Sequence, residues 1–406
     1  MNVFAKQRKT KPLTSADVLD IFTALVTLFI LTPIFFVNAS IALLKNKAIA
    51  KETVIQDAVG RPLYFYQWSF GGFKNSLMLL NILSGDLALC GVSIRRVCLN
   101  DSIATLTQLK PGLFSVYEVH QTIGYIEMNH GESIRHHEKN NTAGFNLSLM
   151  AKALLCRLIY GNKNGKNLKC FNLFGIRIEN VTLNDVVKQI FHRTQHSCQS
   201  IFFVNVNSVN IGFTHKRFRE TLNQADLVLA DGSGVRLGAK RMGFQLQENI
   251  NGTDLLPHIC ENAQHTGQSL FLLGSKPGVA EEASRKLQQQ YPRLVIAGTH
   301  HGYFDTSASD DIIEKINHSK ADICLVAMGS PVQEQWVENN KQRLQTHTAL
   351  AVGGLFDFYS GNIRRAPRWM REIGMEWLYR LAMEPKAKFR RYVLGNPLYI
   401  FRLLAH

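Results

Sequence analysis

Residues 201–235 have the sequence IFFVNVNSVNIGFTHKRFRETLNQADLVLADGSGV. An apolar run rich in β-branched and aromatic residues, 201–206, precedes an amphipathic stretch near 214–224 and a second apolar run, 226–230. This order predicts a strand, a covering helix and a second strand parallel to the first. The glycines of the turn at 231–234 permit a tight bend and the close approach of a ligand.

The same alternation continues towards the C-terminus. Further strands are expected at 269–274, 293–298, 322–329 and 349–354, and helices near 234–243, 253–265, 278–290, 309–319 and 331–344. Nearly continuous apolar strands separated by helices predict an α/β fold, a Rossmann-like parallel sheet covered by helices on both faces. Ligands bind beyond the carboxyl ends of the strands in such sheets, so the polar residues there are the first candidates for a site.

The candidate residues are polar side chains and glycines that follow the predicted strands. They are Asn205, Asn207, Asp231, Gly232, Asn251, Thr253, Asp254, Gly274, Gln333 and Glu334. The structural alternatives are a plain turn for the glycine-rich segments, a helix cap for Asp231, and solvated residues of a first helical turn for Gln333 and Glu334. Thr253 is expected to cap the helix that starts beside Asp254. Since neighbouring residues usually point apart, the pair His300-His301 is not expected to bind a metal.

A series of motifs resembles the WecG/TagA/CpsF family of glycosyltransferases, in the family's order over about 171–395. The motifs are FFVNVNSVNI, ADLVLADGSGV, NGTDLL, LFLLGSKPGVAEEA, HHGYF, MGSPVQEQW and VGGLFDFYSGNIRRAPRWMREIGMEWLYRLAMEP. The resemblance implies inverting transfer of an N-acetylmannosamine-type sugar, or its uronic acid, from UDP to a polyprenyl-diphosphate-linked saccharide, without a metal or another cofactor. The family's proposed base falls on Asp231, and its T-P-N segment on 205–207, where Asn205 replaces the threonine. The family's G-x-P-x-Q-E element is intact at 329–334.

The C-terminal segment 361–406 carries ten Lys and Arg against three Glu. In a metal-free reaction, guanidinium groups and backbone N–H groups must neutralise the departing diphosphate. The arginines expected to do so are Arg364, Arg365, Arg368 and Arg371. Basic residues here alternate with Trp369, Trp377 and leucines, a pattern that suits a membrane surface better than nucleic acid. A solvated helix packed on the domain is the structural alternative.

Residues 21–44 contain no charged residue, and this run of 24 residues is long enough to cross a bilayer as a helix. Basic residues flank both sides, Lys6, Arg8, Lys9 and Lys11 before and Lys45 and Lys47 after, so the positive-inside rule selects no orientation. Thr32-Pro33 lies in the middle of the run, where proline removes a backbone donor. We expect a helix–break–helix hairpin that re-enters one leaflet; a straight span is the alternative.

Three pieces between 48 and 160 resemble, in order, bacterial sugar transferases that move a sugar phosphate onto polyprenyl phosphate. They are GRPLYFYQ (60–67), LNILSGDLALCG (80–91) and LKPGLFSVYEV (109–119). Residues 73–76, Phe-Lys-Asn-Ser, stand where the acidic dyad of those enzymes belongs, and Gly91-Val92-Ser93 replaces their Gly-Pro-Arg-Pro. We therefore interpret 1–160 as a degenerate relative retained as a membrane anchor; an unrelated amphipathic region is the alternative.

The 406 residues, 46% hydrophobic and 19% charged, exclude a disordered chain and a multi-span membrane protein. We predict an anchoring region at 1–160, a linker at 161–170, a glycosyltransferase domain at 171–360 and a C-terminal appendage at 361–406. Seven scattered cysteines indicate a reducing compartment. Together with the uncharged run, the family resemblance implies the cytoplasmic face of the bacterial inner membrane. The expected partners are a UDP-sugar, a lipid-linked acceptor and membrane lipid, and a homo-oligomer stays open. The alternative functions are a phosphoglycosyl transferase and a non-catalytic scaffold for polysaccharide assembly.

Overall fold

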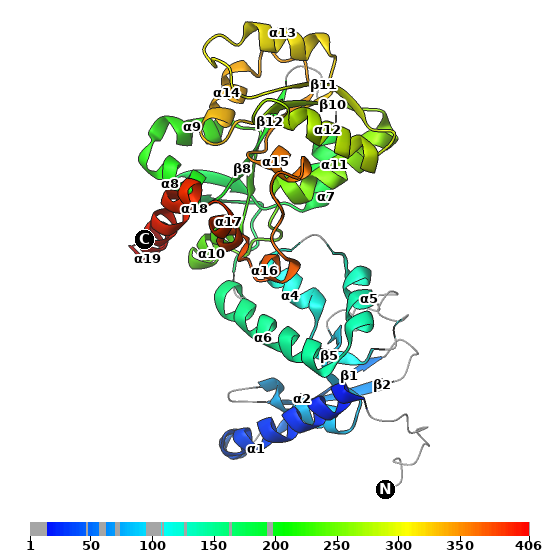
Figure 1. The fold of residues 1–406 in the computed structure, drawn as a ribbon. Helices are drawn as coiled ribbons and strands as arrows, with labels where there is room; N and C mark the ends of the chain where they lie inside the picture. The colour runs from blue at the N-terminus through cyan, green and yellow to red at the C-terminus, as the bar shows by residue number, and fades with distance from the viewer. Residues whose placement is uncertain are drawn as a thin grey trace. The chain divides into compact units, whose positions relative to one another are not determined.

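The computed structural model in Figure 1 divides into two compact units. The N-terminal unit comprises 1–120 and 128–156, and the C-terminal unit comprises 121–127 and 157–406. The domain boundaries expected from the sequence remain a prediction. The structure describes residues 14–45, 48–56, 62–69, 74–94, 107, 109–125, 128–161, 165–192 and 198–405, so Lys6, Arg8, Lys9, Lys11, Lys47 and part of the predicted linker lie outside the described residues.

The C-terminal unit is built on an eight-stranded sheet with the order β11-β10-β12-β13-β8-β9-β7-β6. All neighbours are parallel except β6 and β7. The strands are β6 (Cys170–Leu173), β7 (Ile176–Glu179), β8 (Gln199–Val204), β9 (Leu227–Ala230), β10 (Ser269–Gly274), β11 (Val295–His300), β12 (Ile323–Ala327) and β13 (Thr348–Ala351). The six predicted strands are confirmed with shifted bounds: β8 starts two residues earlier and β11 two residues later than expected, and β12 and β13 end before residues 329 and 354.

Alternate residues of the strands enter two different hydrophobic cores, one on each face of the sheet. Phe202 and Phe271 belong to the first core, whereas their neighbours Ile201 and Leu270 belong to the second. The first face is covered by α8 (Val206–Thr214), α9 (Lys216–Gln224), α10 (Ser233–Arg241), α13 (Asp310–His318), α14 (Val332–Asn340) and α19 (Gly395–Ala405). The second is covered by α7 (Leu183–Phe191), α11 (Gly252–Thr266), α12 (Val279–Gln290) and α15 (Leu355–Tyr359). Figure 1 shows these two helical layers on either side of the strands.

The hairpin β6–β7 and helix α7 were not predicted from the sequence. The hairpin is closed by Phe174 and Gly175, which have φ angles of 52° and 83°, the conformation of a two-residue turn between antiparallel strands. Its strands have only four residues each. Asn172 and Arg177 interrupt these strands, so neither is a continuous apolar run, but the apolar–polar alternation of β7 and the Phe-Gly turn were the available clues.

The C-terminal segment contains α16 (Arg368–Arg371), α17 (Glu376–Met383), α18 (Pro385–Phe389), a π-helical turn (Arg390–Leu394) and α19. The last helix is part of the domain core, because Tyr399 is 1% exposed and its hydroxyl donates to the carbonyl of Gly234 at 2.9 Å. Asn210 of α8 also donates to the carbonyl of Gly395 at 2.8 Å. The end of the chain is therefore integrated into the fold, whereas the sequence analysis treats it as an appendage.

The N-terminal unit starts with α1 (Ser15–Leu44), a single helix that continues through Pro33. The expected break at Thr32-Pro33 is therefore wrong. A proline within a helix removes one backbone hydrogen bond at a cost of about 3 kcal/mol, but the other backbone bonds of this 30-residue helix remain, so α1 extends to Leu44. By length and composition, α1 and α6 (Ala143–Tyr160) are the two helices of the described residues that are apolar enough to cross a membrane.

The remaining elements of the N-terminal unit are short. They are the antiparallel pair β1 (Ala50–Gln56) and β2 (Pro62–Trp68), a 3₁₀ turn (Lys74–Leu77), α2 (Met78–Leu83), the sheet β3-β5-β4 (Ala88–Cys90, Pro111–Phe114 and Val92–Ser93), α5 (His130–Asn140) and α4 (Val116–Ile123), whose residues from 121 onwards belong to the C-terminal unit. Asp20 of α1 joins the helix to this sheet, because its carboxylate accepts from the backbone N–H of Leu89 at 3.1 Å.

Candidate active site

Two of the predicted residues meet where β8 and β9 end. The backbone N–H of Asp231 donates to the carbonyl of Val204 at 2.9 Å, which continues the pairing of the two strands by one residue. The Asn205 amide nitrogen then donates to Oδ2 of Asp231 at 3.3 Å. The Asn205 oxygen accepts from the backbone N–H groups of Asn207 and Ser208, at 3.1 and 3.3 Å, and so caps α8. One asparagine thus starts a helix and orients the carboxylate.

The carboxylate of Asp231 is not used as a helix cap. The residue preceding α10 is Gly232, and no side-chain hydrogen bond caps the first turn of this fully described helix. The capping alternative for Asp231 is therefore wrong. Gly232 has a φ of 94°, which disfavours any residue with a Cβ, and a Cβ placed there would meet no atom within 4 Å. The turn beside Asp231 is therefore open, and a ligand can approach it.

Burial raises the pKa of Asp231 above its ordinary value, and the nearby Glu376 carboxylate raises it further. The guanidinium groups of Arg380 and Arg391 and the Asn205 amide oppose this shift without cancelling it. A half-buried carboxylate with a raised pKa and positive charge close by has the properties of a general base.

Arg380 and Arg391 are functional candidates that the sequence analysis missed. Arg380 lies on α17, where its Nη2 donates to Oε1 of Glu376 at 3.1 Å and its guanidinium stands 4.7 Å from the centre of the Phe358 ring. The ion pair with Glu376 raises the pKa of Arg380, although its burial acts in the opposite direction. The sequence signal was present, because Glu376 and Arg380 are four residues apart on one helix.

The four arginines named from the sequence have different environments. Arg365 forms an ion pair with the buried Asp254, and its Nε lies 3.9 Å from Glu376. Arg368 pairs with Glu372 at 3.0 Å, Arg371 donates to the carbonyl of Ala366 at 3.0 Å, and Arg364 is exposed. Arg365 is thus connected to Arg380 through their common partner Glu376.

The segment 251–254 forms the start of α11. Asn251 is the capping residue, since its oxygen accepts from the backbone N–H of Asp254 at 2.9 Å and its amide donates to Asp254 Oδ2 at 2.7 Å. The prediction that Thr253 is the cap is therefore wrong by two residues. Thr253 is inside the helix, and its carbonyl accepts from the Tyr359 hydroxyl at 3.0 Å.

Gly274 is explained by a close approach between strands. A Cβ at this position would lie 2.3 Å from the carbonyl oxygen of Ala327 at the end of β12, and the φ of Gly274 is 142°. The next backbone N–H, that of Ser275, donates to the same carbonyl at 2.8 Å. A glycine is required here by the packing of β10 against β12, whatever ligand the turn receives.

Gln333 and Glu334 are buried, not solvated, so that alternative is wrong. Oε1 of Gln333 accepts from the backbone N–H groups of Gly329 and Gly353, at 3.1 and 2.9 Å, and thereby joins the turns that follow β12 and β13. Its amide donates to Oε1 of Glu334 at 3.0 Å, and the Ser330 hydroxyl donates to the same oxygen. Burial raises the pKa of Glu334, which is 0% exposed. Gln333 and Glu334 therefore hold the turns at the carboxyl edge of the sheet in place.

Gln333→Leu should destabilise the protein by about 2–6 kcal/mol. The substitution leaves the two glycine N–H groups without their acceptor, at about 1–3 kcal/mol for each buried unsatisfied group. Urea unfolding followed by circular dichroism measures the loss. Gln289→Leu on the exposed side of α12 is the matched control and should change stability by less than about 0.5 kcal/mol. Equal stability of Gln333→Leu and wild type would contradict this role.

Among the described residues, no three His, Cys, Asp or Glu side chains gather as metal ligands. His300 and His301 interact instead with each other, through a contact of 2.7 Å between His300 Nδ1 and the His301 carbonyl.

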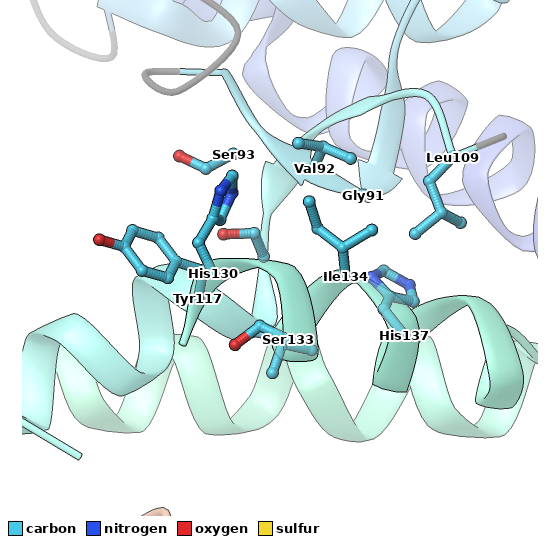
Figure 2. A pocket seen from close by; sticks show the side chains of 11 residues that line it. Gly91, Val92, Ser93, Leu109, Tyr117, His130, Ser133, Ile134 and His137 are labelled. Carbon is cyan, nitrogen blue, oxygen red and sulfur yellow. The ribbon is translucent and has the colours of Figure 1, made fainter. Parts of the chain in front are cut away.

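Figure 2 shows a cavity of about 10 Å³ within the N-terminal unit. Its polar lining comes from Ser93, Ser115, Tyr117, His130, Ser133 and His137. This volume accommodates about one water molecule, whereas pockets for small organic ligands measure about 300–1,000 Å³.

The comparisons with known proteins concern the C-terminal unit. The family model described as "Glycosyl transferase WecG/TagA/CpsF family" matches residues 171–406. Relatives in two Staphylococcus aureus strains, MW2 and MRSA252, are 32% and 31% identical over 236 residues, which is 57% of this chain and 91% of each relative. Both are named N-acetylglucosaminyldiphosphoundecaprenol N-acetyl-beta-D-mannosaminyltransferase. The N-terminal region carries no family assignment, so its likeness to a degenerate sugar transferase stays a prediction.

Proposed function

The chain belongs to the WecG/TagA/CpsF family of glycosyl transferases, and we propose that it transfers an N-acetylmannosamine-type sugar, or its uronic acid, from UDP to a polyprenyl-diphosphate-linked saccharide. The S. aureus relatives are named for the transfer of an N-acetylmannosaminyl group to a lipid-linked N-acetylglucosamine, which supports this donor sugar and this class of acceptor. The product belongs to the biosynthesis of a surface polysaccharide or cell-wall polymer.

The observation that carries the proposal is the environment of Asp231. Its carboxylate lies at the carboxyl edge of a parallel sheet, is held by Asn205 at 3.3 Å, and borders an open turn at Gly232. In the reaction, an acceptor hydroxyl attacks the anomeric carbon from the side opposite UDP, so the configuration inverts. Asp231 takes the hydroxyl proton, while the bond from the sugar to UDP breaks and its electron pair leaves with the diphosphate.

The negative charge that develops on UDP has cationic partners in the C-terminal segment. Arg380 and Arg391 act electrostatically on Asp231, so they are the arginines best suited to reach the diphosphate of a donor bound beside this carboxylate. Arg365 supports them through its connection to Glu376. Asn207, Arg364, Arg368 and Arg371 remain proposed contacts to the substrates.

The proposed location is the cytoplasmic face of the bacterial inner membrane. Helix α1 exposes large apolar side chains, among them Phe29 at 82% and Phe36 at 71%, and its 24-residue uncharged run is long enough to cross a bilayer. Anchoring by α1 would keep the catalytic domain beside an acceptor that is itself held in the membrane by its polyprenyl chain. Trp369, 54% exposed in the basic C-terminal segment, supports a further contact of that segment with the membrane surface.

The pH dependence of the reaction should follow the ionisation of Asp231. A base must be deprotonated, and burial raises the pKa of Asp231, so kcat/KM should fall on acidification through a pKa above the ordinary 3.8 of an aspartate. Initial rates measured from mildly acidic to neutral pH, in buffers of constant ionic strength, give this acid limb. A profile that stays flat down to the ordinary aspartate pKa would contradict the assignment.

The test of the proposed substrates is a panel of donors. The full chain is incubated with UDP-linked N-acetylmannosamine, N-acetylmannosaminuronic acid, N-acetylglucosamine or glucose, and with N-acetylglucosaminyl-diphosphoundecaprenol as acceptor. Mass spectrometry of the lipid product should show the addition of one N-acetylmannosamine or its uronic acid. Transfer of only glucose or N-acetylglucosamine would contradict the proposed donor.

A further inference from the structure

Helix α6 has two different faces. One face packs against protein: Leu149, Ala153 and Cys156 are at most 4% exposed. Buried Asn146 lies on the same face, where its carbonyl accepts from the Cys90 thiol at 3.4 Å and its Oδ1 lies 3.1 Å from His137 Nε2. These residues follow the helical period, so one side of α6 is covered by protein.

The opposite face of α6 is a stripe of exposed leucines. Leu147, Leu154, Leu155 and Leu158 are 58%, 57%, 40% and 78% exposed. Together with exposed Ala151, they occupy positions i, i+4, i+7, i+8 and i+11 of one helix, which defines a continuous apolar stripe. A single exposed leucine is ordinary on a protein surface, but a contiguous stripe of this kind marks an interaction site.

The charge on α6 indicates the chemistry of the partner. The helix contains Lys152 and Arg157 and no acidic residue. At 100° per residue, the two basic residues lie on either side of the leucine stripe, which is the arrangement of helices that lie in the interface of an anionic bilayer. A symmetric dimer through this stripe would instead bring the basic residues of two copies together, which is unfavourable.

We propose that α6 lies in the plane of the membrane surface, with its leucine stripe inserted at the boundary between lipid headgroups and acyl chains. Although α6 has the length and hydropathy of a membrane span, it does not cross the bilayer, because Asn146, Leu149, Ala153 and Cys156 are covered by protein. The inference depends on the proposed anchoring by α1 only for bringing the unit to a bilayer, and it does not depend on glycosyl transfer.

Photo-crosslinking of the full chain tests this proposal. p-Benzoylphenylalanine replaces Leu154, or, as a matched control, Gln289 on the exposed polar side of α12. The protein is reconstituted with vesicles of phosphatidylethanolamine and phosphatidylglycerol in equal amounts, floated in a density gradient, irradiated and analysed by mass spectrometry. Thermal unfolding of both variants should match wild type, because both positions are exposed. Flotation shows whether the protein binds the vesicles. The mass of the adduct identifies the molecule that contacts position 154.

The expected result is an increase of one phospholipid mass on the peptide that contains position 154 and none on the peptide that contains 289. The yield at 154 should fall when Leu147→Gln and Leu158→Gln are added, since these changes remove the rest of the stripe. A crosslink between two chains, or floated protein without a lipid adduct at 154, would overturn the proposal. Protein that fails to float would overturn both this proposal and the anchoring by α1. It would not contradict the transferase activity, which the donor panel tests separately.

Discussion

Asp231→Asn should lower kcat by about 10²–10⁴-fold, the usual effect of removing a general base. The amide has the same shape as the carboxylate but cannot take the acceptor proton. The fold should remain, because the raised pKa of Asp231 shows that its charged form is unfavourable in the folded protein. A group with a raised folded-state pKa stabilises only when protonated, and this contribution is lost as the pH rises through that pKa. At neutral pH the neutral asparagine should therefore leave the melting temperature unchanged or higher.

The measurement compares single-turnover rates and thermal unfolding of Asp231→Asn with those of Asp311→Asn. Asp311 is exposed in the first turn of α13, so its substitution makes the same chemical change outside the proposed site and should leave kcat within a factor of two or so. Near-normal turnover by Asp231→Asn would remove this residue from the role of base. A large loss of melting temperature would show that the carboxylate serves the fold.

Arg380→Ala should lower kcat/KM by about 10²–10³-fold, the loss typical of removing one group that stabilises a developing negative charge. Arg380→Lys should recover only part of the activity, because an ammonium keeps the charge but not the bidentate fork of a guanidinium. The alanine variant also leaves Glu376 without its 3.1 Å partner, so urea unfolding must accompany the kinetics.

Arg285→Ala provides the matched control. Arg285 is 70% exposed and pairs with Glu282 within α12, so its removal should affect neither rate nor stability appreciably. Activity of Arg380→Ala equal to that of the control would show that the leaving diphosphate is neutralised elsewhere. Substitution is preferable to truncation after residue 360, because truncation also deletes Tyr399 and Leu403 from the hydrophobic core.

The sheet was predictable because its central strands are nearly continuous apolar runs separated by amphipathic helices. The same pattern placed Asn205 and Asp231 at one edge, and the structure brings them to 3.3 Å. The hairpin β6–β7 was not recognised because Asn172 and Arg177 interrupt its strands, so neither forms a continuous apolar run. The break expected at Pro33 was wrong because the proline removes one backbone hydrogen bond, whereas the others remain along the 30 residues of α1.

The choice among arginines could not be made from the sequence. In the sequence, the ten basic residues of 361–406 differ only in position, and only their tertiary contacts show which of them act near Asp231. Arg365 and Arg368 have carboxylate partners in Asp254 and Glu372, whereas Arg380 and Arg391 influence the pKa of Asp231. In the same way, the sequence placed Gln333 at the carboxyl edge of the sheet. Its two hydrogen bonds to glycine N–H groups could not be predicted, because they depend on the distance between β12 and β13.

The most direct test is to identify the nucleotide that is released. Wild-type protein and Asp231→Asn are each incubated with UDP-N-acetylmannosamine and the lipid-linked N-acetylglucosamine acceptor. The account predicts stoichiometric UDP and an acceptor heavier by one N-acetylmannosamine with the wild type, and a trace of both with the variant. Release of UMP, or equal UDP formation by the two proteins, would contradict it.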